Sequence, residues 1–199
     1  MAAPSTPGAD RRDTRGMNAD SRLRGQATCA TPFATLAIAT DGRAVTGVRY
    51  LPRTVGPITP TDDVAALALR EVRRYLDDPS YRFTVTLAPV GTAFHRRVWQ
   101  AIAAIPAGAV RTYGAIAHDL GIDARAVGQA CGANPIPLFV PCHRVVGAGG
   151  ALGGFMGHAD PGVREPELFA ADDPGAGDTF VPAEIKRWLL AHEGYRFGG

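Results

Sequence analysis

The stretch "TYGAIAHDLGIDARAVGQACGA" (residues 112–133) has the pattern of two short helices joined by a tight turn. The first helix is predicted over residues 112–120 and ends at Gly121, and the second follows Asp123, a favoured N-cap. Two short helices joined by a glycine-containing turn form a helix-turn-helix. The second helix consists of small, almost uncharged residues, with Arg125 alone near its start. We therefore expect a helix-turn-helix whose second helix is slim and carries one cation.

One further helix is predicted on each side of this pair. The stretch "TAFHRRVWQAIAAIP" begins with Thr92 as an N-cap and stops at Pro106, and "AEIKRWLLAHEG" lies between Pro182 and Gly194. Both show the apolar stripe of an amphipathic helix. The stripes consist of Phe94, Val98, Ala101, Ile102 and Ile105 in the first helix and of Ile185, Trp188, Leu189 and His192 in the second.

Residues 28–90 have the pattern of a small α/β unit. The alternating stretches "PFATLAIAT" and "AVTGVRYL" flank Asp41-Gly42, which is a strong signal for a hairpin turn. A helix is predicted over residues 61–76 with Thr61 as its N-cap, followed by a strand over residues 81–90. The apolar face of that helix consists of Val64, Ala68, Val72 and Tyr75.

Two segments differ in composition from the rest of the chain. Residues 1–27 are rich in Ala, Pro, Gly, Ser, Arg and Asp and lack an apolar stretch, which is typical of a disordered tail rather than of a secretory signal. Residues 159–182 lie in an acidic, proline-rich stretch that is typical of a surface insertion. We therefore expect a tail, an α/β domain over residues 28–90 and a second domain over residues 91–199 that contains the insertion.

Composition excludes several classes of protein. The mean hydropathy is −0.03 and no apolar stretch approaches the ~20 residues of a membrane span, so no membrane partner is expected. The chain has three cysteines without metal-ligand spacing, which favours free thiols in a reducing cytosol and no metal site. Residues 91–150 hold five Arg against two Asp, while the whole chain has a net charge of +2. This local excess fits weak phosphate contact, and it fits an ordinary solvated surface equally well.

The stretch "FVPCHRVV" places Cys142 after Pro141 and before His143 and Arg144. A thiol attacks as its thiolate, which a neighbouring His or Arg can stabilise. Buried cysteines are nevertheless common and usually inert, so this adjacency alone favours a core thiol. The apolar start of the stretch predicts a buried strand that leads to Pro141.

A longer set of motifs resembles the O6-alkylguanine-DNA alkyltransferase family. The motifs are "TYGAIAHDLG", "RAVGQACGANP", "NPIPLFVPCHRVVGAGGALGGF" and "KRWLLAHEG", in family order and close to family spacing. The resemblance covers residues 92–195, interrupted by the acidic insertion, and residues 33–90 look like a diverged N-terminal domain of that family. It implies a ribonuclease H-like N-terminal α/β domain, a small sheet plus a helix, followed by a mainly helical, winged helix-turn-helix-like domain that carries the active site.

The resemblance also implies direct DNA repair by a methylated-DNA–[protein]-cysteine S-methyltransferase. Such a protein binds duplex DNA that contains O6-alkylguanine, flips the base into a pocket and moves the alkyl group onto its own Cys142. It needs no cofactor, acts once and is expected to work as a monomer in the cytoplasm, associated with the nucleoid in a bacterium. The preferred alkyl group and activity on O4-alkylthymine stay open.

Roles for individual residues follow from the resemblance alone. Cys142 would be the nucleophile, and His143 would take the thiol proton through a bridging water. Glu193 would orient His143 as the third member of a Cys-His-acid relay. Asn134 would tie the active-site turns together, and Tyr113 would donate a hydrogen bond to guanine N3 as the base leaves.

The resemblance assigns a DNA-contacting surface and a substrate pocket as well. Arg125 would be the finger that replaces the flipped base through the minor groove. The small residues around it suit that narrow groove, which excludes bulky side chains. The DNA-contacting set is Arg125, Ala124, Ala126, Gly128 and Thr112, and the pocket set is Tyr113, Val145, Phe155 and Met156. Phe155 stands where the family usually has Tyr, which leaves a wall for the base without a hydroxyl.

Two alternatives compete with alkyl transfer. One is a non-catalytic protein that binds alkylated bases and signals to other repair, although such proteins lack the reactive cysteine that this chain has in Cys142. The other is a cysteine hydrolase that uses Cys142 and His143. The chain offers no clear oxyanion-hole motif for hydrolysis, and it does offer a helix-turn-helix.

Overall fold

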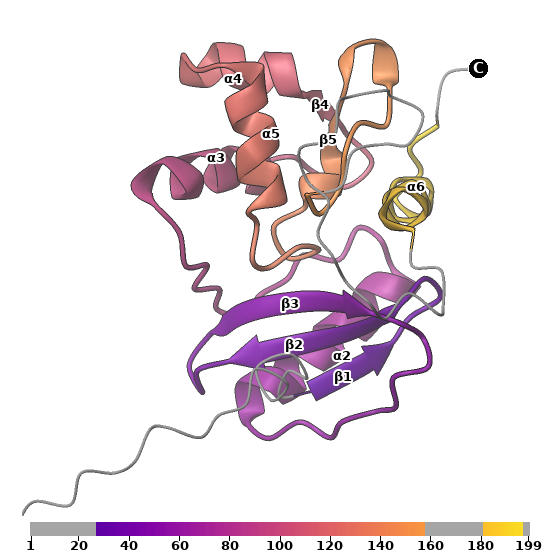
Figure 1. The fold of residues 1–199 in the computed structure, drawn as a ribbon. Helices are drawn as coiled ribbons and strands as arrows, with labels where there is room; N and C mark the ends of the chain where they lie inside the picture. The colour runs from indigo at the N-terminus through magenta and orange to yellow at the C-terminus, as the bar shows by residue number, and fades with distance from the viewer. Residues whose placement is uncertain (1–26, 158–180, 197–199) are drawn as a thin grey trace, which may run out of the picture.

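The computed structural model describes residues 27–157 and 181–196. A three-stranded sheet with one helix comes first, and a mainly helical part follows it (Figure 1). Buried side chains of both parts form one continuous hydrophobic core. The predicted tail falls outside the described residues except for Ala27, and so does most of the predicted insertion, namely residues 159–180.

The sheet is antiparallel, with strand order β1-β2-β3. β2 (Thr35–Thr40) and β3 (Val45–Leu51) form the predicted hairpin, and the Asp41 carboxylate accepts the N–H groups of Arg43 and Ala44 in its turn. β1 (Ala27–Ala30) was not predicted. Its four residues are too few to establish a periodicity, and only pairing with β2 reveals the strand.

Helix α2 (Asp63–Asp77) packs against the sheet, as Figure 1 shows. The predicted cap at Thr61 is wrong, because the Asp62 carboxylate accepts the N–H of Ala65 at 2.7 Å and so begins the helix one residue later. The Thr40 hydroxyl donates to the same carboxylate, which ties the end of β2 to the start of the helix.

The strand predicted over residues 81–90 is wrong. The only pairing there among the described residues is a single bridge between Leu87 and Val45. The buried Glu71 carboxylate of α2 accepts the backbone N–H groups of Thr84 and Val85 at 2.9 and 3.1 Å. These donors therefore face the helix and cannot join a ladder in the sheet.

The predicted helix-turn-helix is confirmed. α4 (Tyr113–Leu120) is capped by the Thr112 hydroxyl and ends at Gly121 with φ +63°, and α5 (Ala124–Gly132) is capped by Asp123. α3 (Ala93–Ala103), capped by Thr92 as predicted, contacts both helices. Figure 1 shows the three helices gathered above the sheet.

The remaining elements bring the end of the chain beside this helical group. β4 (Arg111–Thr112) pairs in parallel with β5 (Val145–Val146), and η1 (Cys142–Arg144) directly precedes β5. η2 (Ala148–Gly150) follows, and α6 (Pro182–His192) contacts η1. No helix among the described residues has the length and apolar character needed to cross a membrane.

The strand expected before Pro141 is also wrong. Residues 136–140 form a tight turn in which the Val140 N–H donates to the Ile136 carbonyl at 3.0 Å, and Leu138 has φ +76°. The segment is buried, as its apolar sequence predicts, but the turn uses the backbone groups that a ladder would need.

Candidate active site

Cys142 is the first residue of η1 and is 3% exposed. Asn134 fixes the turn in front of it: its side-chain nitrogen donates to the Val140 carbonyl at 2.9 Å, and its side-chain oxygen accepts the Ile136 N–H at 3.1 Å. The Cys142 N–H also donates to the Val140 carbonyl, at 2.8 Å. The backbone that leads to the thiol is therefore fixed by hydrogen bonds from Asn134 and from Cys142 itself.

The Cys142 thiol has a raised pKa in this closed arrangement. Burial is the main cause, while the hydrogen bond of Asn134 and the charge of Lys186 act in the opposite direction. A thiol in this state is protonated at neutral pH, so it needs a base before it can attack.

His143 is fully buried beside the thiol-bearing residue, and its Nε2 lies 2.9 Å from Glu193 Oε1. Burial lowers the pKa of His143, against the hydrogen bond and charge of Glu193, so the ring is neutral at pH 7. A neutral ring that donates from Nε2 has its lone pair on Nδ1. Nδ1 is buried and has no hydrogen-bond partner among the described residues.

Glu193 follows the last residue of α6, and its side chain is completely buried. Besides His143, Tyr75 donates its hydroxyl to Oε1 at 2.8 Å, and Arg144 donates to Oε2 from Nε at 2.9 Å and to Oε1 from a terminal nitrogen at 2.8 Å. Burial by itself would raise the pKa of Glu193, but the bonds and charges of His143 and Arg144 hold it at about 2. Glu193 is therefore a buried carboxylate that stays ionised.

Three residues of this cluster were missed or misplaced by sequence reasoning. Arg144, considered as a neighbour of the thiol, instead binds Glu193 and the Ile105 carbonyl. Tyr75 was predicted only as part of an apolar helix face. Lys186 is absent from the predicted site, although it lies two helical turns before Glu193 and so on the same face of α6.

Lys186 is fully buried among backbone carbonyls near the cysteine. Its ammonium donates to Val145 O at 2.7 Å and to Gly154 O at 3.0 Å, and lies 5.8 Å from the centre of the Tyr113 ring. It therefore links β5 to the loop of residues 151–157, and its positive charge acts to lower the pKa of Cys142.

The predicted pocket residues lie in this loop or near it. The Tyr113 hydroxyl donates to Gly154 O at 3.2 Å, and its pKa is raised by burial and by the nearby thiols. Val145 and Phe155 are buried, and Met156 is partly buried with φ +55°. Gly153 has φ +67°, and a Cβ there would lie 2.9 Å from the Tyr113 ring, so the loop and this ring are in close contact.

The predicted DNA-contacting residues lie elsewhere, at the start of the helix-turn-helix elements. Arg125 and Ala124 are exposed in the first turn of α5, and no hydrogen bond or ion pair to the Arg125 side chain occurs within the described part of the chain. The other three, Ala126, Gly128 and Thr112, are partly exposed. The opposite face of α5 is buried, so Arg125 points away from the core.

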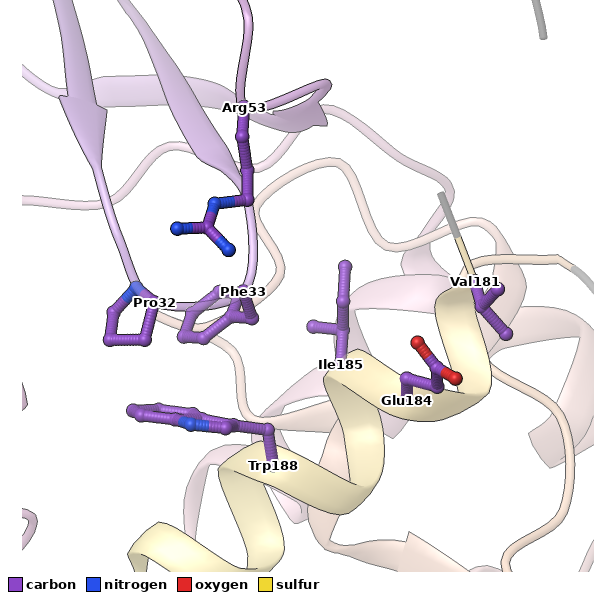
Figure 2. Close-up of a pocket in the computed structure, with 7 residues that line it drawn as sticks. All are labelled: Pro32, Phe33, Arg53, Val181, Glu184, Ile185 and Trp188. Carbon is purple, nitrogen blue, oxygen red and sulfur yellow. The ribbon is translucent and has the colours of Figure 1, made fainter. Parts of the chain in front are cut away.

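A surface groove of about 320 Å³ lies between the β1–β2 loop, Arg53 and α6 (Figure 2). In its lining the rings of Phe33 and Trp188 lie with their centres 4.6 Å apart, and the remaining lining residues are Pro32, Val181, Glu184 and Ile185. None of the predicted site residues lines it. Within the described ranges, no group of three or more His, Cys, Asp or Glu could hold a metal ion, and Cys29, Cys131 and Cys142 are free thiols.

Comparison with known proteins shows which family the chain resembles. The sequence model of the family described as "6-O-methylguanine DNA methyltransferase, DNA binding domain" matches residues 93–195. The methylated-DNA–protein-cysteine methyltransferase of Mycobacterium tuberculosis is 40% identical over 136 residues, which cover 65% of this chain and 82% of that protein. The protein of the same name from Salmonella typhimurium is 46% identical over 114 residues, covering 56% and 53%.

A solved structure of Mycobacterium tuberculosis OGT in complex with DNA is also similar. It has a TM-score of 0.63 and 34% sequence identity, with 83% of this chain and 90% of that chain covered. The fold and the site define a helix-turn-helix protein with a buried Cys-His-Glu cluster. With a family match over more than half of its length, the chain belongs to the 6-O-methylguanine DNA methyltransferase family.

Proposed function

We propose that this protein repairs DNA directly, by moving the alkyl group of O6-alkylguanine in duplex DNA onto Cys142. It is a methylated-DNA–[protein]-cysteine S-methyltransferase that acts once, because the thioether formed on Cys142 does not turn over. The observation that carries the proposal is the buried series of Cys142, His143 and Glu193, in which Glu193 fixes Nε2 and leaves Nδ1 as the proton acceptor.

The chemistry needs one proton transfer and one displacement. The Cys142 thiol gives its proton to His143 Nδ1 through a bridging water, and the ionised Glu193 stabilises the imidazolium that results. The thiolate then attacks the alkyl carbon, the bond between that carbon and O6 breaks, and its electron pair stays on the guanine. Tyr113 donates a hydrogen bond to guanine N3, which stabilises the charge that develops on the base.

The pocket opens at the loop of residues 151–157. Cys142 is only 3% exposed, so a flipped base would reach the thiol only after this loop moves. The hydrogen bonds of Tyr113 and Lys186 to Gly154 hold the loop closed, and Gly153 with φ +67° gives it a hinge. Val145, Phe155 and Met156 would then line the walls around the base.

DNA contacts the helix-turn-helix surface through α5. Arg125 is exposed and unpaired within the described residues, and the side chains beside it are small. This arrangement supports insertion of Arg125 through the minor groove into the place of the flipped base. The partner is duplex DNA that contains O6-alkylguanine, bound by a monomer in the cytoplasm.

The finer description of the fold belongs to the same proposal. The three-stranded sheet with α2 supports a reduced ribonuclease H-like domain. The short β4–β5 pair beside α4 supports a winged form of the helix-turn-helix. The domain boundary would then lie near residue 90, between the sheet part and α3.

Intact-mass measurement after incubation with an O6-methylguanine duplex tests this function. We expect a gain of one methyl group on the peptide that contains Cys142, absent in Cys142→Ser. Cys29→Ser is the matched control, because Cys29 is also a buried free thiol but lies in β1. Tight binding of the lesion without a mass change would contradict alkyl transfer and favour a non-catalytic reader.

A further inference from the structure

We propose that Tyr75, on α2 of the sheet part, is a positioning residue for alkyl transfer that acts through Glu193. Its hydroxyl occupies the same carboxylate oxygen that His143 uses, and it thereby limits the negative charge that Glu193 presents to His143. The inference rests on the proposed function of Cys142, His143 and Glu193.

The contact joins two parts of the chain that are 118 residues apart in sequence. Tyr75 donates to Glu193 Oε1 at 2.8 Å, and His143 donates to the same oxygen at 2.9 Å. Tyr75 is 1% exposed and the Glu193 side chain is fully buried, so water does not replace either donor. Together with a terminal nitrogen of Arg144 at 2.8 Å, three donors therefore share one oxygen that is shielded from water, where each bond alters the others.

Tyr75 is itself held in place by the residue that precedes Glu193. Its carbonyl accepts a hydrogen bond from His192 Nε2 at 2.8 Å, and the two rings meet edge to face with centres 5.2 Å apart. Burial and the charge of Glu193 raise the pKa of Tyr75, so the phenol keeps its proton and remains a donor at every pH near neutrality.

The other charged and titratable groups around this carboxylate do not replace the phenol. Arg144 binds both carboxylate oxygens and so fixes the plane of the carboxylate. The groups that face the Tyr75–Glu193–His143 contact are Tyr50 from β3, Tyr75 from α2, Cys142, His143 and Arg144 from η1, and Lys186 and His192 from α6. Among these, apart from His143 itself, Tyr75 is the neutral donor on Oε1.

The direction of the effect follows from charge. A hydroxyl that donates to Oε1 withdraws negative charge from it and makes Glu193 a weaker partner for the imidazolium. Without this hydroxyl, His143 keeps its proton to a higher pH. His143 must be neutral to accept the thiol proton. In the variant without the hydroxyl, the rate of alkyl transfer should therefore begin to fall at a higher pH as the solution is made more acidic.

The test is the single-turnover rate of methyl transfer from duplex O6-methylguanine between about pH 5 and about pH 9. In Tyr75→Phe we expect the acidic midpoint to move upward by about 0.5 pH units. Tyr81→Phe is the matched control, because Tyr81 also donates to a glutamate, Glu71, and its ring also contacts Phe83. An unchanged or lowered midpoint in Tyr75→Phe would overturn the inference, as would an equal shift in Tyr81→Phe.

A second substitution keeps the test open if Tyr75→Phe does not fold. Tyr75→3-fluorotyrosine retains the ring and makes the phenol a stronger donor, so the midpoint should move downward; an upward shift or none overturns the inference. If the wild-type protein showed no methyl transfer, the proposed function itself would be contradicted. The two failures are therefore distinguishable.

Discussion

His143 Nε2 and Glu193 Oε1 lie 2.9 Å apart, and both side chains are fully buried. The bond connects η1 to the end of α6 and decides which imidazole nitrogen can accept a proton. Because Arg144 binds both oxygens of the same carboxylate, the buried charge is paired without protonating the histidine.

Replacing Glu193 by Gln should slow methyl transfer by about a hundredfold, because the imidazolium loses its counter-charge. Glu184→Gln is the matched control, since Glu184 lies exposed in the first turn of the same helix. The measurement is the single-turnover rate on duplex O6-methylguanine at neutral pH. Equal rates for both variants would mean that the Glu193 charge plays no part in the proton transfer.

The same carboxylate makes folding stability depend on pH. Its pKa is about 2 in the folded protein against an ordinary value of 4.5, so the unfolded chain binds the proton more readily between these values. The ionised Glu193 therefore contributes about 3 kcal/mol to the free energy of unfolding above pH 4.5, and this contribution is lost as the pH falls toward 2. The free energy of unfolding of the wild type, measured in urea, should fall as the pH is lowered through this window. In Glu193→Gln the same free energy should depend less on pH. Parallel pH curves for the two proteins would contradict this origin.

Sequence predicted the local part of the site well. Thr92, Asp123 and Gly121 were recognised as helix ends because capping depends on residues a few positions apart, and the structure confirms all three. Cys142, His143 and Asn134 lie within ten residues of one another, so the motif that carries the family resemblance is continuous in the sequence.

The parts that sequence missed depend on contacts between distant segments. Tyr75 reads as an apolar face residue, and nothing in its own helix shows that its hydroxyl meets Glu193. Residues 81–90 have the composition of a strand, yet Glu71 captures the donors of Thr84 and Val85. Each outcome is fixed by a buried carboxylate whose partners lie elsewhere in the chain.

Lys186→Met should slow methyl transfer by about tenfold, since the charge of Lys186 acts to lower the pKa of Cys142 and its removal leaves the thiol harder to ionise. A methionine of similar length in place of a buried charge need not destabilise the fold, so thermal unfolding is measured alongside the rate. Arg187→Met is the control, because Arg187 is exposed on the next position of α6. A wild-type rate in Lys186→Met would show that this charge does not reach the thiol.

Arg125→Ala should slow methyl transfer from duplex DNA strongly and leave the reaction with free O6-benzylguanine nearly unchanged. The reason is that Arg125 is exposed at the start of α5, away from Cys142, and acts only where a base must leave the stack. Arg70→Ala is the control, since Arg70 is equally exposed but lies on α2. Both rates are followed as the mass gain on Cys142. If Arg125→Ala lost activity equally on duplex and free base, its role would lie in the fold or the pocket, because a base that is already free needs no flipping.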